Sequence, residues 1–569
     1  MKMPFVKNTP CVTKTLRATL ALALAFVATS RATAQEKPLI VVSLPSYTAI
    51  AEDAGYIGKV IGQPMLKETF EQVADFQLGG LEGLDKSRPL GAAVMTDGAA
   101  FRVLGFIPVT DLDKLLATLS RHAPEGAVEI SDTAGGAKKV AGLGQTLYAK
   151  AKGGWAFLSQ DEDSLGSLPD PAALMGGMEK RYDIGIRMNF QNVPEIYRDL
   201  AVTGLKAGIR SSLKKNDGET DEQFAERKKF IQAQMRQVTR AINDLDELTI
   251  GMKVDGSQQK VAMEFAATAV AGSETAKQYD LLKDLKTRFG GFSSEDAVVS
   301  ISAVSKVRKE DTAQLTSLLS TARNQMDQQI ENSEGLPPEA KAKFKDLGGQ
   351  LLDVISETLG TGTIDGGMIV SGEGPFTLAS GMHVADGAKV DKLLREVVAL
   401  GEAQGAFAEV KYEAEKMGDI AFHQITPMLP EGKEDIKEFL GASPQLVFGI
   451  GKNSFYVAAG TGALESLKGL ITKSATKVDE PATPAKFVVA LKPILTYALK
   501  KDPINPPLEA ATKAVAGGAD KVRMTSNVIP RGSRVTIELE EGVVKAIAAA
   551  AQGSGIGAGA GAGFDPDRP

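Results

Sequence analysis

The chain has 569 residues, of which 43% are hydrophobic and 24% charged, and its formal net charge is −6. This length exceeds the roughly 250–300 residues that one hydrophobic core usually supports, so we expect two or more domains. The acidic balance disfavours nucleic acid or an anionic membrane as the main partner.

Residues 1–34 have the composition of a secretory signal peptide. A basic start precedes a short apolar stretch at 18–29, and Ala-Thr-Ala at 32–34 supplies small residues for cleavage. We therefore expect export to the periplasm or the extracellular space; an uncleaved N-terminal anchor is the alternative. Cleavage would remove five basic residues and the only cysteine, Cys11, and would leave a net charge of −11. Disulfides, thiolate metal sites and cysteine nucleophiles are then excluded, and no later stretch has the roughly 20 apolar residues of a membrane-spanning helix.

The mature chain begins with a strand, two helices and a hairpin. The strand is expected at 39–45, where β-branched residues dominate, and the helices at 49–61 and 65–76. Residues 91–119 then predict two strands around a turn at Asp97-Gly98, followed by a helix from about Asp111.

The same hairpin and helix recur at residues 366–397. Aligned without gaps, Gly91, Phe101, Val109 and Asp111 meet Gly366, Phe376, Val384 and Asp386. A strand at 298–302 and longer helices at 311–331 and 339–359 precede this second copy, in the order found before the first.

Three further features recur in the same order. They are an aromatic strand (154–159 and 454–459), a strand followed by a helix that contains a tyrosine (182–190 with Tyr197, and 485–491 with Tyr497), and a closing strand pair (248–254 with 260–266, and 522–528 with 533–539). We therefore predict a tandem duplication with halves at 37–288 and 292–552. Each half is expected to be an α+β domain, an antiparallel sheet with helices packed mainly on one face. Two domains side by side and a pseudo-twofold arrangement that shares a larger sheet are both open.

Two segments break the repeat. Residues 219–248 predict a long charged helix whose apolar stripe has nearly coiled-coil spacing. The stripe consists of Phe224, Ile231, Met235, Val238, Ile242 and Leu245. It is expected either to pack on the helix's own sheet or to contact a partner or a second copy. The tail at 553–569 is rich in Gly and Ala, with few bulky residues, and is predicted to be flexible, with a terminal tether as the alternative.

The sequence contains no strong catalytic or metal-binding motif. The histidines are His122, His383 and His423, and their spacing matches no zinc motif, so we expect each in a loop or on a strand surface. There is no G-x-S-x-G elbow, and Gly449–Ser454 is interpreted as a hairpin turn rather than a phosphate loop. We therefore assign no catalytic, cofactor-binding or metal-binding residue, and no cofactor.

Acidic residues give only weak signals of chemistry. Asp161 and Asp163 fit the start of a calcium loop, but Leu165 occupies the next ligand position, so a solvated turn is expected. Paired carboxylates for glycoside hydrolysis stay open, because their separation is set by the tertiary structure. The only tryptophan, Trp155, is expected in a core rather than on a sugar-binding platform.

Two short motifs carry a resemblance to a known group of proteins. They are residues 83–91, GLDKSRPLG, and residues 154–159, GWAFLS. With these motifs the chain resembles large exported bacterial proteins of unknown function that contain a duplicated α+β unit. The second half departs from the first motif, with GTIDG at 362–366. The resemblance implies the duplicated fold and transfers no activity or functional residue.

These observations favour a non-enzymatic exported protein of the cell envelope that acts by binding or scaffolding, with a protein or lipid partner. The first alternative is a carrier that holds an apolar ligand in a groove between sheet and helices. The second is a hydrolase with a dispersed carboxylate or serine site. The asymmetric helix at 219–248 and the cleft between the halves are the places where a site is expected.

Overall fold

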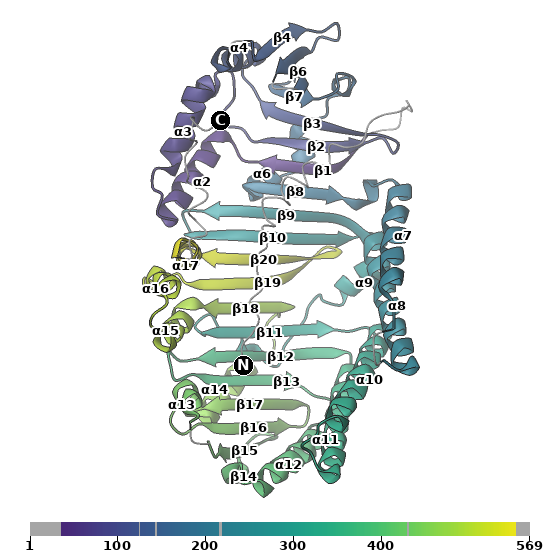
Figure 1. Ribbon diagram of the computed structural model, residues 1–569, viewed down its shortest axis with the longest axis vertical. Helices are drawn as coiled ribbons and strands as arrows, with labels where there is room; N and C mark the ends of the chain where they lie inside the picture. Colours follow the sequence, from purple (N-terminus) through teal and green to yellow (C-terminus); the bar gives the residue numbers. More distant parts are fainter. Residues whose placement is uncertain (1–35, 125, 143–144, 216–218, 430–431, 554–569) are drawn as a thin grey trace. The chain divides into compact units, whose positions relative to one another are not determined.

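The computed structural model describes residues 36–553, apart from 125, 143–144, 216–218 and 430–431 (Figure 1). The predicted signal peptide at 1–34 and the predicted flexible tail from residue 554 lie outside the described residues.

The described chain divides into two compact units. Unit 1 contains the residues up to 49 together with 72–199, and unit 2 contains 50–71 together with the residues from 200 onward. These units are defined by contacts in space, whereas the predicted halves at 37–288 and 292–552 are defined by sequence, and those boundaries stay a prediction.

The strands of unit 1 pair in an antiparallel manner. Their bounds are β1 (Lys37–Leu44), β2 (Leu90–Thr96), β3 (Phe101–Pro108), β4 (Val128–Asp132), β5 (Lys138–Gly142), β6 (Gln145–Lys152), β7 (Trp155–Ser159) and β8 (Ile184–Asn189). Their order in the sheet is β4-β5-β6-β7-β3-β2-β1-β8. The β-branched strand β1 is therefore paired on both sides, by β2 and β8, as its apolar sequence predicts.

Unit 2 also has an antiparallel sheet. Its strands are β9 (Leu245–Asp255), β10 (Lys260–Ala269), β11 (Val299–Lys306), β12 (Thr363–Ser371), β13 (Thr377–His383), β14 (Phe407–Met417), β15 (Ile420–Pro427), β16 (Gln445–Gly451), β17 (Ser454–Gly460), β18 (Ala485–Ala490), β19 (Lys521–Ile529) and β20 (Gly532–Glu540). They run in the order β9-β10-β20-β19-β18-β11-β12-β13-β17-β16-β15-β14. The closing strands of the two predicted halves, β10 and β20, pair directly, from Lys260 opposite Glu540 to Thr268 opposite Gly532.

The same strand order occurs in both units. The sequence β8-β1-β2-β3-β7-β6-β5-β4 of unit 1 corresponds to β18-β11-β12-β13-β17-β16-β15-β14 of unit 2. The strands recognised twice at 39–45, 91–108, 154–159 and 182–190 occupy the same places in their sheet as their counterparts, whereas both closing strand pairs lie in unit 2. A common order agrees with a duplicated sequence, and the duplication itself stays a prediction.

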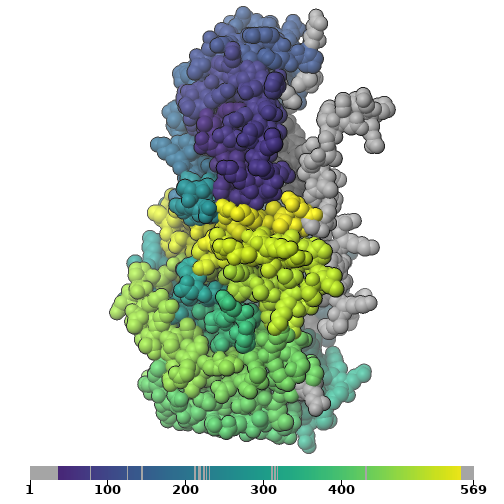
Figure 2. Space-filling model, turned by 90° about the vertical axis from the view of Figure 1, so that its left-hand side faces the viewer, coloured from purple at the N-terminus to yellow at the C-terminus, as the bar shows by residue number. Residues whose placement is uncertain are grey.

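The helices of the described chain are of very different lengths. They are α2 (Tyr47–Val60), α3 (Leu66–Gln77), α4 (Leu112–His122), α5 (Pro171–Met175), α6 (Met178–Arg181), α7 (Glu195–Ser212), α8 (Asp221–Asp244), α9 (Glu274–Asp280), α10 (Lys309–Glu331), α11 (Pro338–Gly360), α12 (Gly387–Ala403), α13 (Glu434–Leu440), α14 (Ala463–Thr476), α15 (Leu491–Lys501), α16 (Pro506–Ala514) and α17 (Glu541–Gly553). In unit 2, α8, α10 and α11 lie at one end of the strands (Figure 1). Helices α15, α16 and α17 lie at the other end, where they form a continuous surface (Figure 2). The fold is α+β with extensive antiparallel sheet, as the sequence predicts.

Each unit has its own buried core. In unit 1, Phe106, Phe157 and Trp155 are buried among residues of the sheet and of α5 and α6. In unit 2, Leu467 and other apolar residues of α14 pack on Phe422 and Tyr456 of the sheet. Both clusters consist of apolar side chains, whose burial stabilises the two cores.

Helix α8 is shorter than the sequence suggests. The helical pattern was expected to run to Leu248, but the helix ends at Asp244 and Leu245 begins β9. Leu245, Glu247 and Leu248 pair with Ala269, Thr268 and Ala267 of β10. The backbone hydrogen bonds of this pairing make Leu245–Leu248 part of a strand, although the spacing of Leu245 from the preceding apolar residues is helical.

Candidate functional site

Described residues of α7 and α8 form a groove between these two helices. Helix α8 is anchored at its start by Arg227, which forms an ion pair of 2.7 Å with Glu219 and lies 5.3 Å from the centre of the Phe224 ring. Helix α7 precedes it in the chain and carries an apolar side formed by Val202, Ile209 and the adjoining Leu213. The sequence therefore supplies two consecutive amphipathic helices.

The groove has a volume of about 850 Å³ and is formed entirely by unit 2. Apolar side chains from both helices line it: Ile209, Leu213, Phe224, Ile231 and Met235. Polar and charged side chains complete the lining: Lys206, Arg210, Lys228, Gln232, Arg236, Thr239, Arg240, Asn243 and Asp244. The lining of the groove thus combines apolar side chains with several basic ones.

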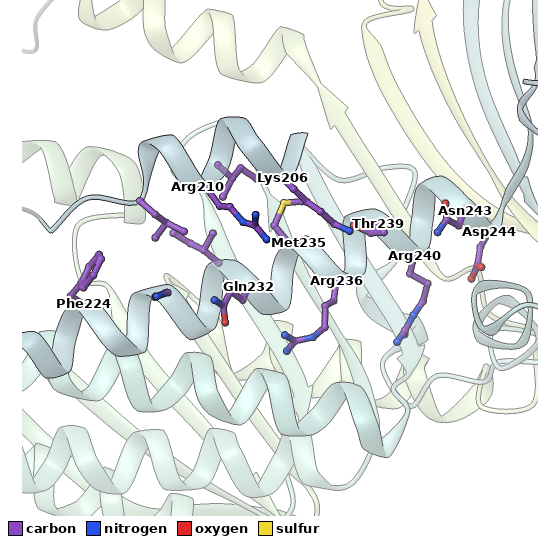
Figure 3. A pocket seen from close by; sticks show the side chains of 14 residues that line it. Lys206, Arg210, Phe224, Gln232, Met235, Arg236, Thr239, Arg240, Asn243 and Asp244 are labelled. Carbon is purple, nitrogen blue, oxygen red and sulfur yellow. The ribbon is translucent and has the colours of Figure 1, made fainter. Parts of the chain in front are cut away.

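The basic side chains do not all point the same way. Arg210 and Lys206 extend from α7 toward α8, where Met235 and Thr239 lie (Figure 3). Arg236 and Arg240 extend from α8 away from α7 (Figure 3). The two cations of α7 are one helical turn apart and therefore share one face of that helix.

Several polar groups of the groove have no partner among the described residues. Lys206, Arg210, Lys228 and Arg236 form no ion pair with any other described residue. The Thr239 hydroxyl is buried and has no hydrogen-bond partner in the described part of the chain. Asp244, in contrast, accepts hydrogen bonds from the Thr275 backbone at 3.1 Å and from its hydroxyl at 2.7 Å. The groove thus holds free positive charge and a free hydroxyl.

The apolar stripe predicted on residues 219–248 contributes directly to this groove. Phe224, Ile231 and Met235 line it, whereas Val238 is 42% exposed outside it. The sequence therefore located one wall of the groove. It missed the residues of α7, although Lys206 and Arg210 at i and i+4 beside Ile209 and Leu213 were a signal of an amphipathic helix.

His423 corrects a prediction from the sequence. It was expected on a strand surface, but it lies in β15 and is only 1% exposed, because α12 covers it. Its Nε2 is 3.1 Å from Asp391 Oδ1, and its Nδ1 accepts a hydrogen bond of 3.3 Å from the Glu413 backbone. Burial lowers the pKa of His423, against the opposing effect of Asp391. Since both ring nitrogens face protein groups, we interpret this histidine as part of the core.

The other two histidines contact backbone carbonyl groups. His122 was also expected in a loop or strand, but it is the last residue of α4, and its Nδ1 lies 2.9 Å from the Thr118 carbonyl. His383 ends β13, with Nδ1 3.1 Å from the Asn453 carbonyl. Each of these rings thus has one nitrogen within hydrogen-bond distance of a backbone carbonyl oxygen.

The residues that recur in both halves also have structural roles. Asp111 caps α4 by accepting a hydrogen bond from the Lys114 backbone at 3.0 Å, and Asp386 caps α12 through the Ala388 backbone at 2.9 Å. The strand-to-helix corners predicted for these aspartates are confirmed. Gly449–Ser454 spans the tight turn between β16 and β17, as predicted.

The two motifs of residues 83–91 and 154–159 meet in space. The guanidinium of Arg88 lies 4.3 Å from the centre of the Trp155 ring and donates a hydrogen bond of 3.2 Å to the Gly154 carbonyl. Trp155 is 6% exposed, which confirms its place in a core. The motifs therefore hold a strand and a loop together.

Acidic side chains do not gather into a metal centre in the part of the chain that the structure describes. Asp161 instead accepts a hydrogen bond of 3.1 Å from the Ser164 hydroxyl. A smaller recess of about 560 Å³ includes Glu438 and Lys500, but these two side chains form an ion pair of 3.0 Å. None of the helices among the described residues combines the length and the apolar content needed to span a bilayer.

Comparisons with known proteins give only a loose structural likeness. No family model matches the sequence, and no curated protein matches it. Crystal form IV of TP0453 matches with a TM-score of 0.20 and 8% identity, covering 41% of this chain and 77% of that chain. Crystal form III of the same protein matches with a TM-score of 0.20 and 9% identity, covering 42% and 78%. A likeness this low supports no inference about function.

Proposed function

We propose that the protein is a non-enzymatic binding protein that holds a long apolar ligand in the groove between α7 and α8. The observation that carries this proposal is the unfilled space between two amphipathic helices. Ile209 and Leu213 on one side and Ile231 and Met235 on the other line a volume of about 850 Å³. Apolar surface gains free energy when a ligand removes it from water, and the volume lies within the roughly 300–1,000 Å³ of small-molecule pockets.

Of the hypotheses that the sequence left open, this proposal is nearest to the carrier, although the carrier was expected to have a groove between sheet and helices and the groove here lies between two helices. A scaffold that binds a folded protein would use a broader surface, since stable protein interfaces bury about 800 Å² on each partner. A hydrolase needs a nucleophile or base beside its substrate. The polar lining of the groove contains cations, amides, one threonine and a single carboxylate, Asp244, rather than a histidine or a pair of carboxylates.

Binding of the neutral dye N-phenylnaphthylamine, whose fluorescence rises in apolar surroundings, tests the proposal. The double variant Ile231→Gln/Met235→Gln is expected to weaken dye binding by about tenfold, which corresponds to about 1.4 kcal/mol. Val238→Gln is the matched control, because Val238 lies on the same helix but outside the groove lining. Absence of dye binding to the wild type, or equal binding to the double variant, would overturn the proposal. Circular dichroism establishes that both variants keep the fold.

The place of action proposed for this protein is outside the cytoplasm. The basic start, the short apolar stretch and the cleavage site of residues 1–34 support export. Mass spectrometry of protein from the cell envelope or the medium is expected to find Gln35 at the N-terminus. A mature protein that begins at Met1 would contradict cleavage.

A further inference from the structure

We infer that the ligand of the α7–α8 groove is a single acyl chain with an acidic head group, and that Lys206 and Arg210 bind this head group. The inference rests on the proposed function and names the chemistry of the ligand. It assigns the apolar residues of the groove to the acyl chain. It assigns the two cations of α7, together with the hydroxyl of Thr239, to the acid.

The charge of the groove is opposite to the charge of the protein. The whole chain carries −6, yet the lining contains five cations, Lys206, Arg210, Lys228, Arg236 and Arg240, and one carboxylate, Asp244. That carboxylate is already bound by Thr275. A cluster of one sign beside a low-dielectric apolar wall attracts a ligand of the other sign.

The direction of the side chains places the acid within the groove. Lys206 and Arg210 extend toward α8, and neither forms an ion pair with a described residue (Figure 3). Thr239 lines the same part of the groove with a buried, unpartnered hydroxyl. A buried polar group without a partner is energetically unfavourable, and an oxygen of the ligand would accept a hydrogen bond from the Thr239 hydroxyl. Carboxylate and phosphate oxygens both suit the planar fork of an arginine.

The apolar residues continue from this point along the groove. From Thr239 back to Phe224, α8 extends about 22 Å at a rise of 1.5 Å per residue. Ile231 and Met235 lie between these ends, and Ile209 and Leu213 face them from α7. This length accommodates an extended long-chain acyl group. A peptide helix, which is about 10 Å across with its side chains, requires a wider groove than this volume provides.

Titration calorimetry of the signal-free protein with oleate, oleyl phosphate and oleyl alcohol tests the inference. The three probes share one chain and differ in the head group. We expect at least one of the acids to bind about tenfold more tightly than the alcohol, a difference of about 1.4 kcal/mol. The acid that binds more tightly identifies the head group as carboxylate or phosphate.

Charge removal at matched positions locates the head group. Lys206→Gln/Arg210→Gln is expected to weaken binding of the acids about tenfold and to change binding of the alcohol less than about twofold. Lys214→Gln/Lys229→Gln removes the same charge from exposed side chains that do not line the groove, and is expected to have a much smaller effect. Rising salt is expected to weaken binding of the acids only.

Each contrary result has a distinct meaning. Equal affinity for the acids and the alcohol would overturn the acidic head group and leave the proposed apolar groove intact. Equal losses in the two charge variants would overturn the assignment to Lys206 and Arg210. Absence of binding by all three probes would overturn both the inference and the proposed function.

Discussion

Phe376 packs against Tyr497, with ring centres 5.5 Å apart and ring planes at 70°. Phe101 packs against Tyr197 in the same way in unit 1, with ring centres 5.4 Å apart and planes at 54°. Phe101 is the first residue of β3 and Phe376 immediately precedes β13, and each tyrosine lies in the α-helix that follows β8 or β18. The sequence had matched these residues as equivalents, and their contacts agree with that match.

The two phenylalanines are expected to differ in their contribution to stability. Phe376 is 3% exposed and also contacts Phe439, whereas Phe101 is only partly buried. Phe376→Ala should lower the free energy of unfolding by about 3–5 kcal/mol, because it leaves a cavity in a closed core. Phe101→Ala should lower the free energy of unfolding by clearly less than Phe376→Ala. Denaturant unfolding followed by circular dichroism measures both, and a larger loss at Phe101 would contradict the difference in burial.

The helix caps offer a matched pair of substitutions. Asp111→Ala and Asp386→Ala each remove one side-chain hydrogen bond at the start of a helix. Each should lower the free energy of unfolding by about 1 kcal/mol, and Asn at the same position should restore most of it. Equal stability of the Ala and Asn variants in urea would show that these side chains do not cap.

Arg88 and Trp155 provide an optical test inside unit 1. Trp155 is the only tryptophan, so intrinsic tryptophan fluorescence reports on this position alone. Arg88→Ala removes the cation above the ring and the hydrogen bond to Gly154. This variant should shift the Trp155 emission and lower the free energy of unfolding by about 1 kcal/mol. Arg88→Lys should restore part of the effect. An unchanged emission spectrum in Arg88→Ala would mean that the stacking is absent in solution.

His423 predicts how stability depends on pH. Burial lowers its pKa in the folded protein, so the unfolded chain, with a histidine pKa near about 6.5, takes up the proton first. The free energy of unfolding is therefore highest above about pH 6.5 and decreases as the pH falls below that value. One proton can change it by at most about 1.4 kcal/mol per pH unit. Asp391, Arg395 and Glu413 are the ionisable groups that act on the ring.

Replacement of the histidine isolates its contribution. His423→Gln should make unfolding free energy less dependent on pH between about 5 and 7, whatever its effect on stability at neutral pH. Urea unfolding at several pH values measures the slope. An identical slope in the variant and the wild type would assign the dependence to other groups.

Local chemistry explains what the sequence predicted well. The turn at Asp97 is fixed by its own side chain, which accepts hydrogen bonds from the backbones of Ala99 and Ala100. The caps at Asp111 and Asp386 are local in the same sense. The strands and helices predicted around these residues therefore begin and end close to their observed bounds.

Contacts between distant segments explain what the sequence did not predict. The end of α8 depends on pairing of Leu245–Leu248 with β10, and the burial of His423 depends on α12. The groove likewise requires α7 to lie opposite α8, and the spacing of residues within either helix does not specify how far apart the two helices lie. The apolar stripe of α8 was visible from its period, whereas the positions of Lys206 and Arg210 beside it were not.

Photo-crosslinking with a fatty acid that carries a diazirine on its chain tests most directly whether the groove binds an acyl ligand. After irradiation and proteolysis, mass spectrometry identifies the labelled peptides. The account predicts saturable labelling of the segments at 206–213 and 224–239, competed by unlabelled oleate and reduced in Ile231→Gln/Met235→Gln. Labelling that is confined to other segments, such as α10 and α11, or that does not saturate, would contradict it.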